Sequence, residues 1–339
     1  MAKRIRVAVA MSGGVDSGVT AALLKKQGFD VAGIFMKLFD SSVFRGSEKR
    51  ARETAKKLGI SFSVLDLRKE FKKKVFNYFL DEYKKGRTPN PCVVCNKEIK
   101  FGLLLKKALS LKVDFIASGH YARKTGNKLL KARDKDKDQS YFLWKLSRKQ
   151  LGRILFPLGD YTKKKVKDLA KNLKLPLLNI PESQEICFVG KGINDFLKKY
   201  LKAKPGIIVD EKGEDLGLHQ GLCFYTIGQR KGIGLSGGPY YVIGKNIKNN
   251  VLAVSRNKKD LEKKELIAEE VNWVSGGKPK LPLKIKAKTR SRQKEFLATI
   301  KPFGKKIKVI FDKPQRAITS GQSVVFYSGQ ELLGGGIIE

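Results

Sequence analysis

Hydrophobic positions in the first two hundred residues form short β-branched runs that alternate with longer stretches of helical periodicity. The short runs predict strands at 5–10, 29–36, 61–66 and 113–118. The periodic stretches predict helices at 17–27, 46–58, 67–85, 96–110 and 163–173. Such alternation is typical of an α/β fold with a doubly wound parallel sheet, in which ligands bind at the carboxyl ends of the strands.

The pattern changes after about residue 202, where closely spaced glycines separate short runs such as 222–227 and 240–243. These runs predict a small β-rich central domain. From about residue 265 onward, turns separate further runs that predict a C-terminal β-barrel. Its strands are expected at 282–290, 296–300, 306–311, 323–327 and 331–338. We therefore expect three domains, over 1–201, 202–264 and 265–339.

One segment of the α/β domain, KGRTPNPCVVC at 85–95, interrupts the alternation of strands and helices. It contains two prolines and has no periodicity, so we expect an exposed loop. Loops of this type often carry functional residues.

The chain is strongly basic, with 71 lysines and arginines against 32 aspartates and glutamates and a formal net charge of +39. Such an excess favours a polyanionic partner such as RNA or DNA. Residues 271–339 hold 14 basic and 4 acidic residues, which suits a small β-barrel that binds RNA. Lysine is nevertheless spread along the whole chain, so a lysine-rich genome explains the charge equally well. The 41% hydrophobic content excludes a disordered chain.

No run approaches the roughly 20 apolar residues that cross a bilayer, so we expect no membrane partner. Lys3 and Arg4 lead straight into the first strand, which favours a cytoplasmic protein. Four cysteines are too few for a secreted disulfide framework, and in a reducing compartment they are candidates for redox, nucleophilic or metal-binding roles. They are Cys92, Cys95, Cys187 and Cys223.

The strongest motif is the string SGGVDS at 12–17, between the first strand and the first helix. Two glycines allow a sharp turn that brings backbone N–H groups close to an anion, and the helix amino end adds partial positive charge. The string has no Gly-Lys-Ser/Thr ending and so no lysine to reach a γ-phosphate, which argues against a Walker A loop. It resembles the pyrophosphate-binding loop of the ATP pyrophosphatase superfamily, whose members adenylate an oxygen and release pyrophosphate.

Two of the cysteines, Cys95 and Cys187, lie in segments that contain proline or glutamine and do not look like core. An adenylated carbonyl needs a nucleophile, and a thiolate or persulfide is a strong one where a basic environment lowers its pKa. Two thiols suit sulfur delivery, because one can carry a persulfide and the other can attack it and leave a disulfide. For Cys223, within a predicted strand, we expect an inert thiol.

Several blocks in order along nearly the whole chain resemble the tRNA-specific 2-thiouridylases, which thiolate C2 of the wobble uridine, position 34, in certain tRNAs. The blocks include MSGGVDS (11–17), GIFMK (33–37), TPNPCVVCNKEIKFG (88–102), SGHYAR (118–123), KDQSYFL (137–143), SQEICFVG (183–190) and GLHQGLCFYTIGQRKGIG (217–234).

This resemblance implies an ATP pyrophosphatase domain at 1–201 that uses ATP with Mg²⁺, with Cys187 as the persulfide carrier and Cys95 as its partner nucleophile. It implies a tRNA with a wobble uridine and a protein sulfur donor, either a persulfide carrier or a cysteine desulfurase, as partners, and no DNA. The implied nucleotide contacts are Ala10, Met11, Ser12, Gly13, Gly14, Val15, Asp16, Ser17, Met36 and Gly119. The implied contacts to the base or the tRNA are Asn90, Pro91, Cys92, His120, Lys137, Asp138, Gln139, Arg290, Ser291 and Gln322.

The chain departs from many family members at Cys92, where they have aspartate. A carboxylate there could transfer a proton or orient the base, and this chain lacks it. Cys92, Cys95 and Cys187 together could instead hold an iron–sulfur cluster. We favour the persulfide relay and expect no metal at these thiols, because the family motif requires only two of them.

Several interpretations stay open at this point. A related enzyme that forms 4-thiouridine or lysidine, or a non-catalytic RNA-binding protein with a nucleotide loop, would share many of these features. His120 is equally well a structural histidine, and Asp138 can simply favour a helix amino end. The lysine runs 72–74 and 163–165 are expected to be solvated helix faces.

Overall fold

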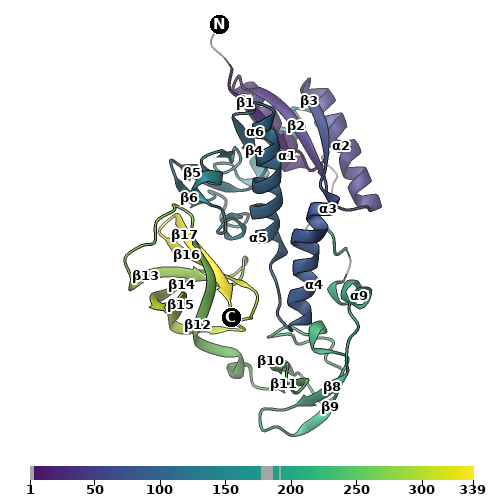
Figure 1. Ribbon diagram of the computed structural model, residues 1–339, viewed down its shortest axis with the longest axis vertical. Helices are drawn as coiled ribbons and strands as arrows, with labels where there is room; N and C mark the ends of the chain where they lie inside the picture. Colours follow the sequence, from purple (N-terminus) through teal and green to yellow (C-terminus); the bar gives the residue numbers. More distant parts are fainter. Residues whose placement is uncertain (1–3, 177–185, 191) are drawn as a thin grey trace.

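The computed structural model describes residues 4–176, 186–190 and 192–339 and confirms the alternating pattern of the first domain (Figure 1). The first half of this domain contains β1 (Arg6–Ala10), α1 (Val15–Lys26), β2 (Asp30–Lys37), α2 (Ser42–Leu58), β3 (Ser61–Asp66), α3 (Arg68–Phe71), the π-helical turn η1 (Lys72–Phe76) and α4 (Asn77–Lys84). The second half contains α5 (Pro91–Cys95), the π-helical η2 (Asn96–Leu103), α6 (Leu104–Ser110), β4 (Phe115–Ala117), β5 (Ala122–Thr125), β6 (Lys128–Lys131), η3 (Ser140–Phe142), α7 (Arg148–Leu151), β7 (Ile154–Leu155), α8 (Lys163–Asn172) and α9 (Ile193–Lys198).

Five parallel strands form the sheet of this domain in the order β3-β2-β1-β4-β7. Successive side chains of β1 point to opposite faces, as a strand requires. Val7 and Val9 pack with apolar residues of α1 and α2, whereas Ala8 packs with residues of η2 and α6. Helices therefore cover both faces, and the predicted doubly wound parallel sheet is confirmed.

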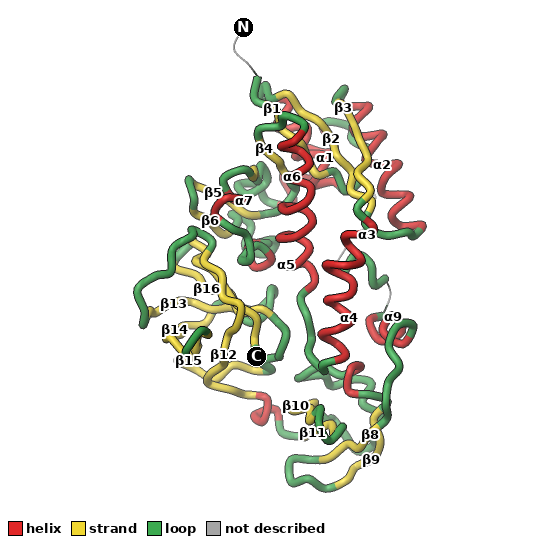
Figure 2. Tube along the Cα trace, viewed as in Figure 1, coloured by secondary structure: helices red, strands yellow, loops and turns green. Residues whose placement is uncertain are grey.

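The expectation of an exposed loop over 85–95 is wrong for its second half. Helix α5 begins at Pro91, where a proline suits the first helical position because its fixed φ is helical and its missing N–H needs no partner there. Val93 and Cys95 are buried. The residues from Pro91 to Ser110 consequently form one continuous helical segment, which runs through the centre of the view in Figure 2.

The small central domain is a four-stranded sheet in the order β10-β11-β8-β9. Its strands are β8 (Gly206–Val209), β9 (Asp215–His219), β10 (Tyr241–Asn246) and β11 (Val251–Ser255). The predicted strand at 222–227 is wrong, because this segment begins with the 3-10 turn η4 (Leu222–Phe224). Leu222 and Phe224 bury their side chains against the helices α3 to α4, so hydrophobic residues that resemble a strand instead fill a domain contact.

The C-terminal domain is a closed antiparallel barrel in the order β12-β15-β14-β13-β16-β17, with β12 also paired to β17. Its strands are β12 (Glu262–Trp273), β13 (Leu283–Lys288), β14 (Phe296–Phe303), β15 (Lys306–Arg316), β16 (Ser323–Ser328) and β17 (Glu331–Ile338), and η5 (Lys258–Leu261) precedes them. The hairpin β5–β6 of the first domain extends this sheet, because Leu129 and Leu130 pair with Leu332 and Glu331 of β17. In the described part of the chain, no helix combines the length and apolar character needed to cross a membrane.

Candidate active site

A wide cavity of about 2030 Å³ opens where β1, β2 and β4 end, at the edge of the sheet where the fold predicts a ligand. It is lined by all three domains, including Thr226 of the central domain and Lys286 of the barrel. Fourteen lysines and arginines but only four acidic residues line it. A cavity with this charge attracts and holds a polyanion.

The loop 12–17 lines the cavity and forms a tight turn at the amino end of α1. Gly13 has a φ of +74°, and a Cβ atom there would lie 2.1 Å from the carbonyl oxygen of Ser47, so only glycine fits. Gly14 is the N-cap of α1 and provides no side-chain cap, so no cap side chain occupies the first helical N–H groups, and Gly14 to Ser17 line the cavity. The Ser17 hydroxyl donates to the Gly14 carbonyl (3.0 Å) and accepts from the Ser12 backbone N–H (3.2 Å).

The remaining residues implied as nucleotide contacts surround this loop. Ala10, Met11, Met36 and Gly119 all line the cavity. A Cβ atom at Gly119 would lie 2.9 Å from Asp16 atoms, so glycine lets the turn after β4 approach the loop closely. The structure thus brings the predicted nucleotide residues together.

Lys163, the first residue of α8, contacts the same loop. Its Nζ lies 2.7 and 2.8 Å from the two carboxylate oxygens of Asp16, and the Tyr121 hydroxyl donates to one of them (2.9 Å). The Lys163 side chain is only 11% exposed. Our expectation that 163–165 is a solvated helix face is therefore wrong for Lys163, although Lys164 and Lys165 are exposed.

Three of the four cysteines lie close to one another at this cavity. Cys92 and Cys95 lie on α5, and Cys187 lies close enough that each of these thiols affects the titration of another. Cys95 is buried, whereas Cys92 and Cys187 line the cavity. All four cysteines of the chain are free thiols here. The part of the motif at 183–185 lies outside the described residues.

The local environment keeps these thiols protonated. Burial raises the pKa of Cys187 to about 11 and that of Cys95 to about 12, and it also raises the pKa of Cys92. Cys187 is exposed on the cavity wall, yet the surrounding protein still desolvates its thiol. The Lys100 ammonium acts in the opposite direction but more weakly. The expected basic environment that lowers the thiol pKa is therefore present only as a minor effect.

The same three thiols are candidate ligands of an iron–sulfur cluster. Among residues 4–176, 186–190 and 192–339, no group of three or more His, Cys, Asp or Glu side chains is arranged to hold a metal ion. Cys223 is half-buried on η4 and packs against an apolar cluster that the α/β domain shares with the central domain.

The loop before α5, residues 87–90, is held by the C-terminal barrel. The Arg87 guanidinium pairs with Glu82 (Nε–Oε2, 3.0 Å) and with Glu269 of β12 (Nη2–Oε1, 2.7 Å). Thr88 donates its backbone N–H to the Ser320 carbonyl (2.8 Å). The Gln322 amide donates to the Thr88 carbonyl at 2.9 Å. The barrel therefore positions the loop that carries the implied base contacts.

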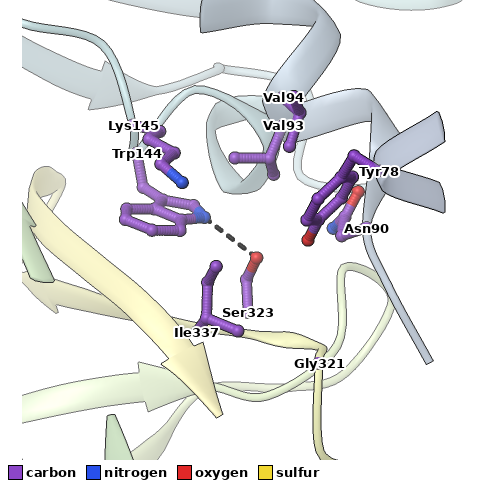
Figure 3. A pocket seen from close by; sticks show the side chains of 9 residues that line it. All are labelled: Tyr78, Asn90, Val93, Val94, Trp144, Lys145, Gly321, Ser323 and Ile337. Carbon is purple, nitrogen blue, oxygen red and sulfur yellow. Dashed lines mark hydrogen bonds between the residues drawn. The ribbon is translucent and has the colours of Figure 1, made fainter. Parts of the chain in front are cut away.

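Figure 3 shows this junction from close by. Asn90 and Tyr78 lie on one side, and the indole of Trp144 donates to the Ser323 hydroxyl of β16 at 3.0 Å. Asn90 also lines the active-site cavity, and Pro91 follows it at the start of α5. Asn90 thus lies where barrel, helix and cavity meet.

The other residues implied as tRNA contacts, His120, Lys137, Asp138, Gln139, Arg290, Ser291 and Gln322, all line the cavity. Burial lowers the pKa of His120 well below its usual value, so its ring is neutral. Several of these side chains also hold protein groups. Asp138 accepts from Ala132 N–H, and Gln139 accepts from Tyr121 N–H. Arg290 donates to the Ile227 carbonyl, and Gln322 donates to the Thr88 carbonyl. These four side chains shape the site.

Sequence reasoning missed Lys100, Lys163 and Arg87. Lys100 lies within the block 88–102, but nothing in its spacing indicated a position near the thiols. Lys163 lies in a run of three lysines that was predicted to be solvated, and Arg87 lies in a segment that was predicted to be a loop. The only available signal was a basic residue next to a motif, or one at the first turn of a helix, where the helix dipole disfavours a positive charge.

Comparison with known proteins matches consecutive parts of the chain to known families. Three family models match: the tRNA methyl transferase HUP domain at 5–191, the tRNA methyl transferase PRC-barrel domain at 194–256 and the aminomethyltransferase beta-barrel domain at 263–338. The chain is 47% identical to the tRNA-specific 2-thiouridylase MnmA of Clostridioides difficile (strain 630), covering 98% of both chains. It is 49% identical to MnmA 2 of Thermoanaerobacter sp. (strain X514), again over 98% of both.

Among solved structures, the chain is similar to the U34-tRNA thiolase NcsA from Methanococcus maripaludis with its 4Fe–4S cluster, at 21% identity and a TM-score of 0.38, covering 57% of this chain and 62% of that one. It is also similar to the NMN synthetase from Francisella tularensis, at 17% identity and a TM-score of 0.37, covering 53% of this chain and 67% of that one. The family matches and the near full-length identity to the two bacterial enzymes establish that the chain belongs to the tRNA-specific 2-thiouridylase family.

Proposed function

We propose that this protein uses ATP to thiolate C2 of the wobble uridine, position 34, of tRNA. The observation that carries the proposal is a single basic cavity that joins the phosphate-binding loop 12–17 to the wall bearing Cys92 and Cys187. A nucleotide at one end and a thiol at the other are the two components that the reaction needs. The near full-length relatives named as tRNA-specific 2-thiouridylases support the choice of substrate.

The chemistry divides into two steps. The uridine O2 attacks the α-phosphorus of ATP and pyrophosphate leaves, which converts O2 into a good leaving group. The terminal sulfur of a persulfide on Cys187 then attacks C2 and AMP departs, which leaves the base joined to Cys187 through an S–S bond. The Cys95 thiolate attacks the Sγ of Cys187, the S–S bond to the base breaks with its electron pair on the 2-thiouridine sulfur, and Cys95 and Cys187 are left joined as a disulfide. Cys187 lines the cavity and can receive sulfur, whereas buried Cys95 lies behind it.

A protonated thiol at Cys187 suits the resting enzyme. A thiolate would be oxidised or alkylated between turnovers, whereas a thiol with a pKa of about 11 is nearly inert at neutral pH. Activation then depends on delivery of sulfur by a donor, because a persulfide ionises more readily than a thiol. We propose a protein carrier or a cysteine desulfurase as that donor, and the cytoplasm as the compartment.

ATP would bind with Mg²⁺ as the counter-ion of its phosphates. Asp16 is the carboxylate of the phosphate loop, and carboxylate oxygens are ligands that Mg²⁺ accepts. No step of this proposal uses an iron–sulfur cluster, because the persulfide relay needs only the thiols of Cys95 and Cys187.

Incubation of the purified protein with ATP, a persulfide donor and unmodified tRNA, followed by nucleoside mass spectrometry, tests the proposal. We expect 2-thiouridine at position 34, together with equal amounts of AMP and pyrophosphate. Sulfur at another base, a lysine adduct, or tRNA binding without any product would reject it in favour of the related activities considered above.

A further inference from the structure

The ammonium group of Lys163 stands over the phosphate-binding loop although the two are 147 residues apart. Lys163 occupies the first turn of α8, where the helix dipole disfavours a positive charge. Two acidic side chains offset this cost: Asp134 accepts from its backbone N–H (2.8 Å), and Asp16 accepts from its Nζ. This lysine is mostly buried, lies where its charge is disfavoured and contacts the loop. We therefore expect it to do more than keep the protein soluble.

The packing of α8 fixes where this ammonium group can reach. Val166 and Ala170 of α8 are fully buried in one cluster with Val19 of α1, the helix that begins at the phosphate loop. A common core therefore fixes the two helix amino ends relative to each other, and Lys163 reaches the loop from the start of α8. Tyr121 packs in the same cluster, with Lys163 Nζ 5.7 Å from its ring centroid.

The loop itself contains no lysine, so the charge on the outer phosphates of ATP has no partner within the motif. We propose that Lys163 is the phosphate-binding cation of this site, held by Asp16 before nucleotide binds and transferred to an oxygen of the β- or γ-phosphate when ATP enters. This proposal rests on the proposed use of ATP. When uridine O2 bonds to the α-phosphorus, the bond to the bridging oxygen breaks and its electron pair stays on pyrophosphate, whose growing charge the ammonium group stabilises.

The test compares the affinities of ATP and AMP in Lys163→Ala, measured by calorimetric titration with Mg²⁺ and without tRNA. AMP lacks the outer phosphates, so we expect ATP affinity to fall by about tenfold or more while AMP affinity changes less than about twofold. Lys164→Ala is the matched control, because this neighbouring lysine is exposed and should leave both affinities unchanged. Lys163→Arg should recover part of the preference for ATP.

Two outcomes would overturn the proposal. An equal loss of ATP and AMP affinity would show that Lys163 only maintains the loop through Asp16, and unchanged ATP affinity with normal pyrophosphate release would show that it does not touch the phosphates. A thermal-melting measurement on each variant identifies any loss of folding. Because this experiment reads nucleotide binding, it can succeed even if the protein thiolates no tRNA, and thiolation by a Lys163→Ala protein with normal ATP affinity would reject this inference alone.

Discussion

The Cys187 thiol faces the cavity yet has a pKa raised to about 11 by desolvation. Only the thiolate reacts with iodoacetamide. We therefore expect the alkylation rate of Cys187 in the free enzyme to rise about tenfold for each pH unit from 7 to 9.5, because its thiolate fraction keeps growing while the pH stays below the pKa. Peptide mass spectrometry after timed quenching measures this rate for each cysteine separately.

The alternative outcome is easily recognised. A thiol with an ordinary pKa near 9 would approach a plateau by pH 9.5, so a plateau in the Cys187 profile would show that its environment does not favour the protonated form. Lys100→Met provides a second comparison, since loss of this nearby cation should slow alkylation further. Lys97→Met, on the same helical segment, is its control.

A persulfide relay and a metal cluster predict different effects of substitutions at Cys92, Cys95 and Cys187. We expect Cys95→Ser and Cys187→Ser to lose thiolation by at least about a thousandfold, because each removes a sulfur that forms or breaks a bond. Cys92→Asp should retain activity, since the sulfur of Cys92 forms and breaks no bond in the relay. Nucleoside mass spectrometry measures the product. An anaerobically purified protein that contains iron, together with loss of iron and activity in Cys92→Asp, would contradict the relay.

The candidate site was predictable at the residue level where a local motif carries it. The loop 12–17 places its phosphate-binding groups within six residues, and the spacing of Cys92 and Cys95 depends on one helical turn. Lys163 could not be found in this way. Its role depends on α8 packing against α1, and a lysine in a run of three has no local feature that marks it as buried.

Among the elements, the strands of the parallel sheet and their covering helices followed from periodicity, because each buries one continuous face. The start of α5 did not follow from periodicity. The prolines at 89 and 91 indicate a loop, and only tertiary packing shows that Val93 and Cys95 are buried. The strand prediction for 222–227 was wrong for the opposite reason. Its apolar residues suit a strand, but a contact with the helices α3 to α4 buries them without strand pairing.

The loop between α4 and α5 gives a prediction at the level of elements. Arg87→Ala removes ion pairs to Glu82 and Glu269, which join this loop to the barrel. We expect the free energy of unfolding to fall by about 1–3 kcal/mol, because both carboxylates are mostly buried. The thiolation rate should fall with ATP affinity unchanged, because the base-binding loop moves while the phosphate loop does not. Chemical denaturation and single-turnover thiolation measure the two effects.

Lys84→Ala is the matched control for this variant. Lys84 is the last residue of α4, the helix that contains Glu82. It pairs with Asp81 on the surface, where a single ion pair contributes little to the free energy of unfolding. A wild-type thiolation rate in Arg87→Ala would show that the barrel supports the fold without positioning the loop.

At the scale of the whole molecule, the barrel and the α/β domain share one core. Val325 and Tyr327 of β16 pack with residues of the α/β domain, and β17 extends into the hairpin β5–β6. This arrangement was not predictable, because a four-residue strand such as β6 has no periodicity of its own and is stabilised by its partner. Removal of the barrel would expose this core, so its contribution to RNA binding must be tested with point variants.

The barrel strand β13 provides such variants, since its lysines alternate with buried residues and share one face. Lys286 lines the active-site cavity, whereas Lys284, two residues earlier and also exposed, does not. If Lys286 neutralises one tRNA phosphate, Lys286→Ala should make the dependence of log K on log salt less steep by about 0.7–0.9, because one fewer counter-ion is released on binding. Lys284→Ala should leave this slope unchanged. Filter binding of unmodified tRNA between about 50 and 200 mM salt measures both. Equal slopes in the two variants would show that the basic composition of the chain acts as a diffuse charge, and a reduced slope in Lys286→Ala alone would place the tRNA backbone in the cavity that joins the nucleotide loop to the cysteines.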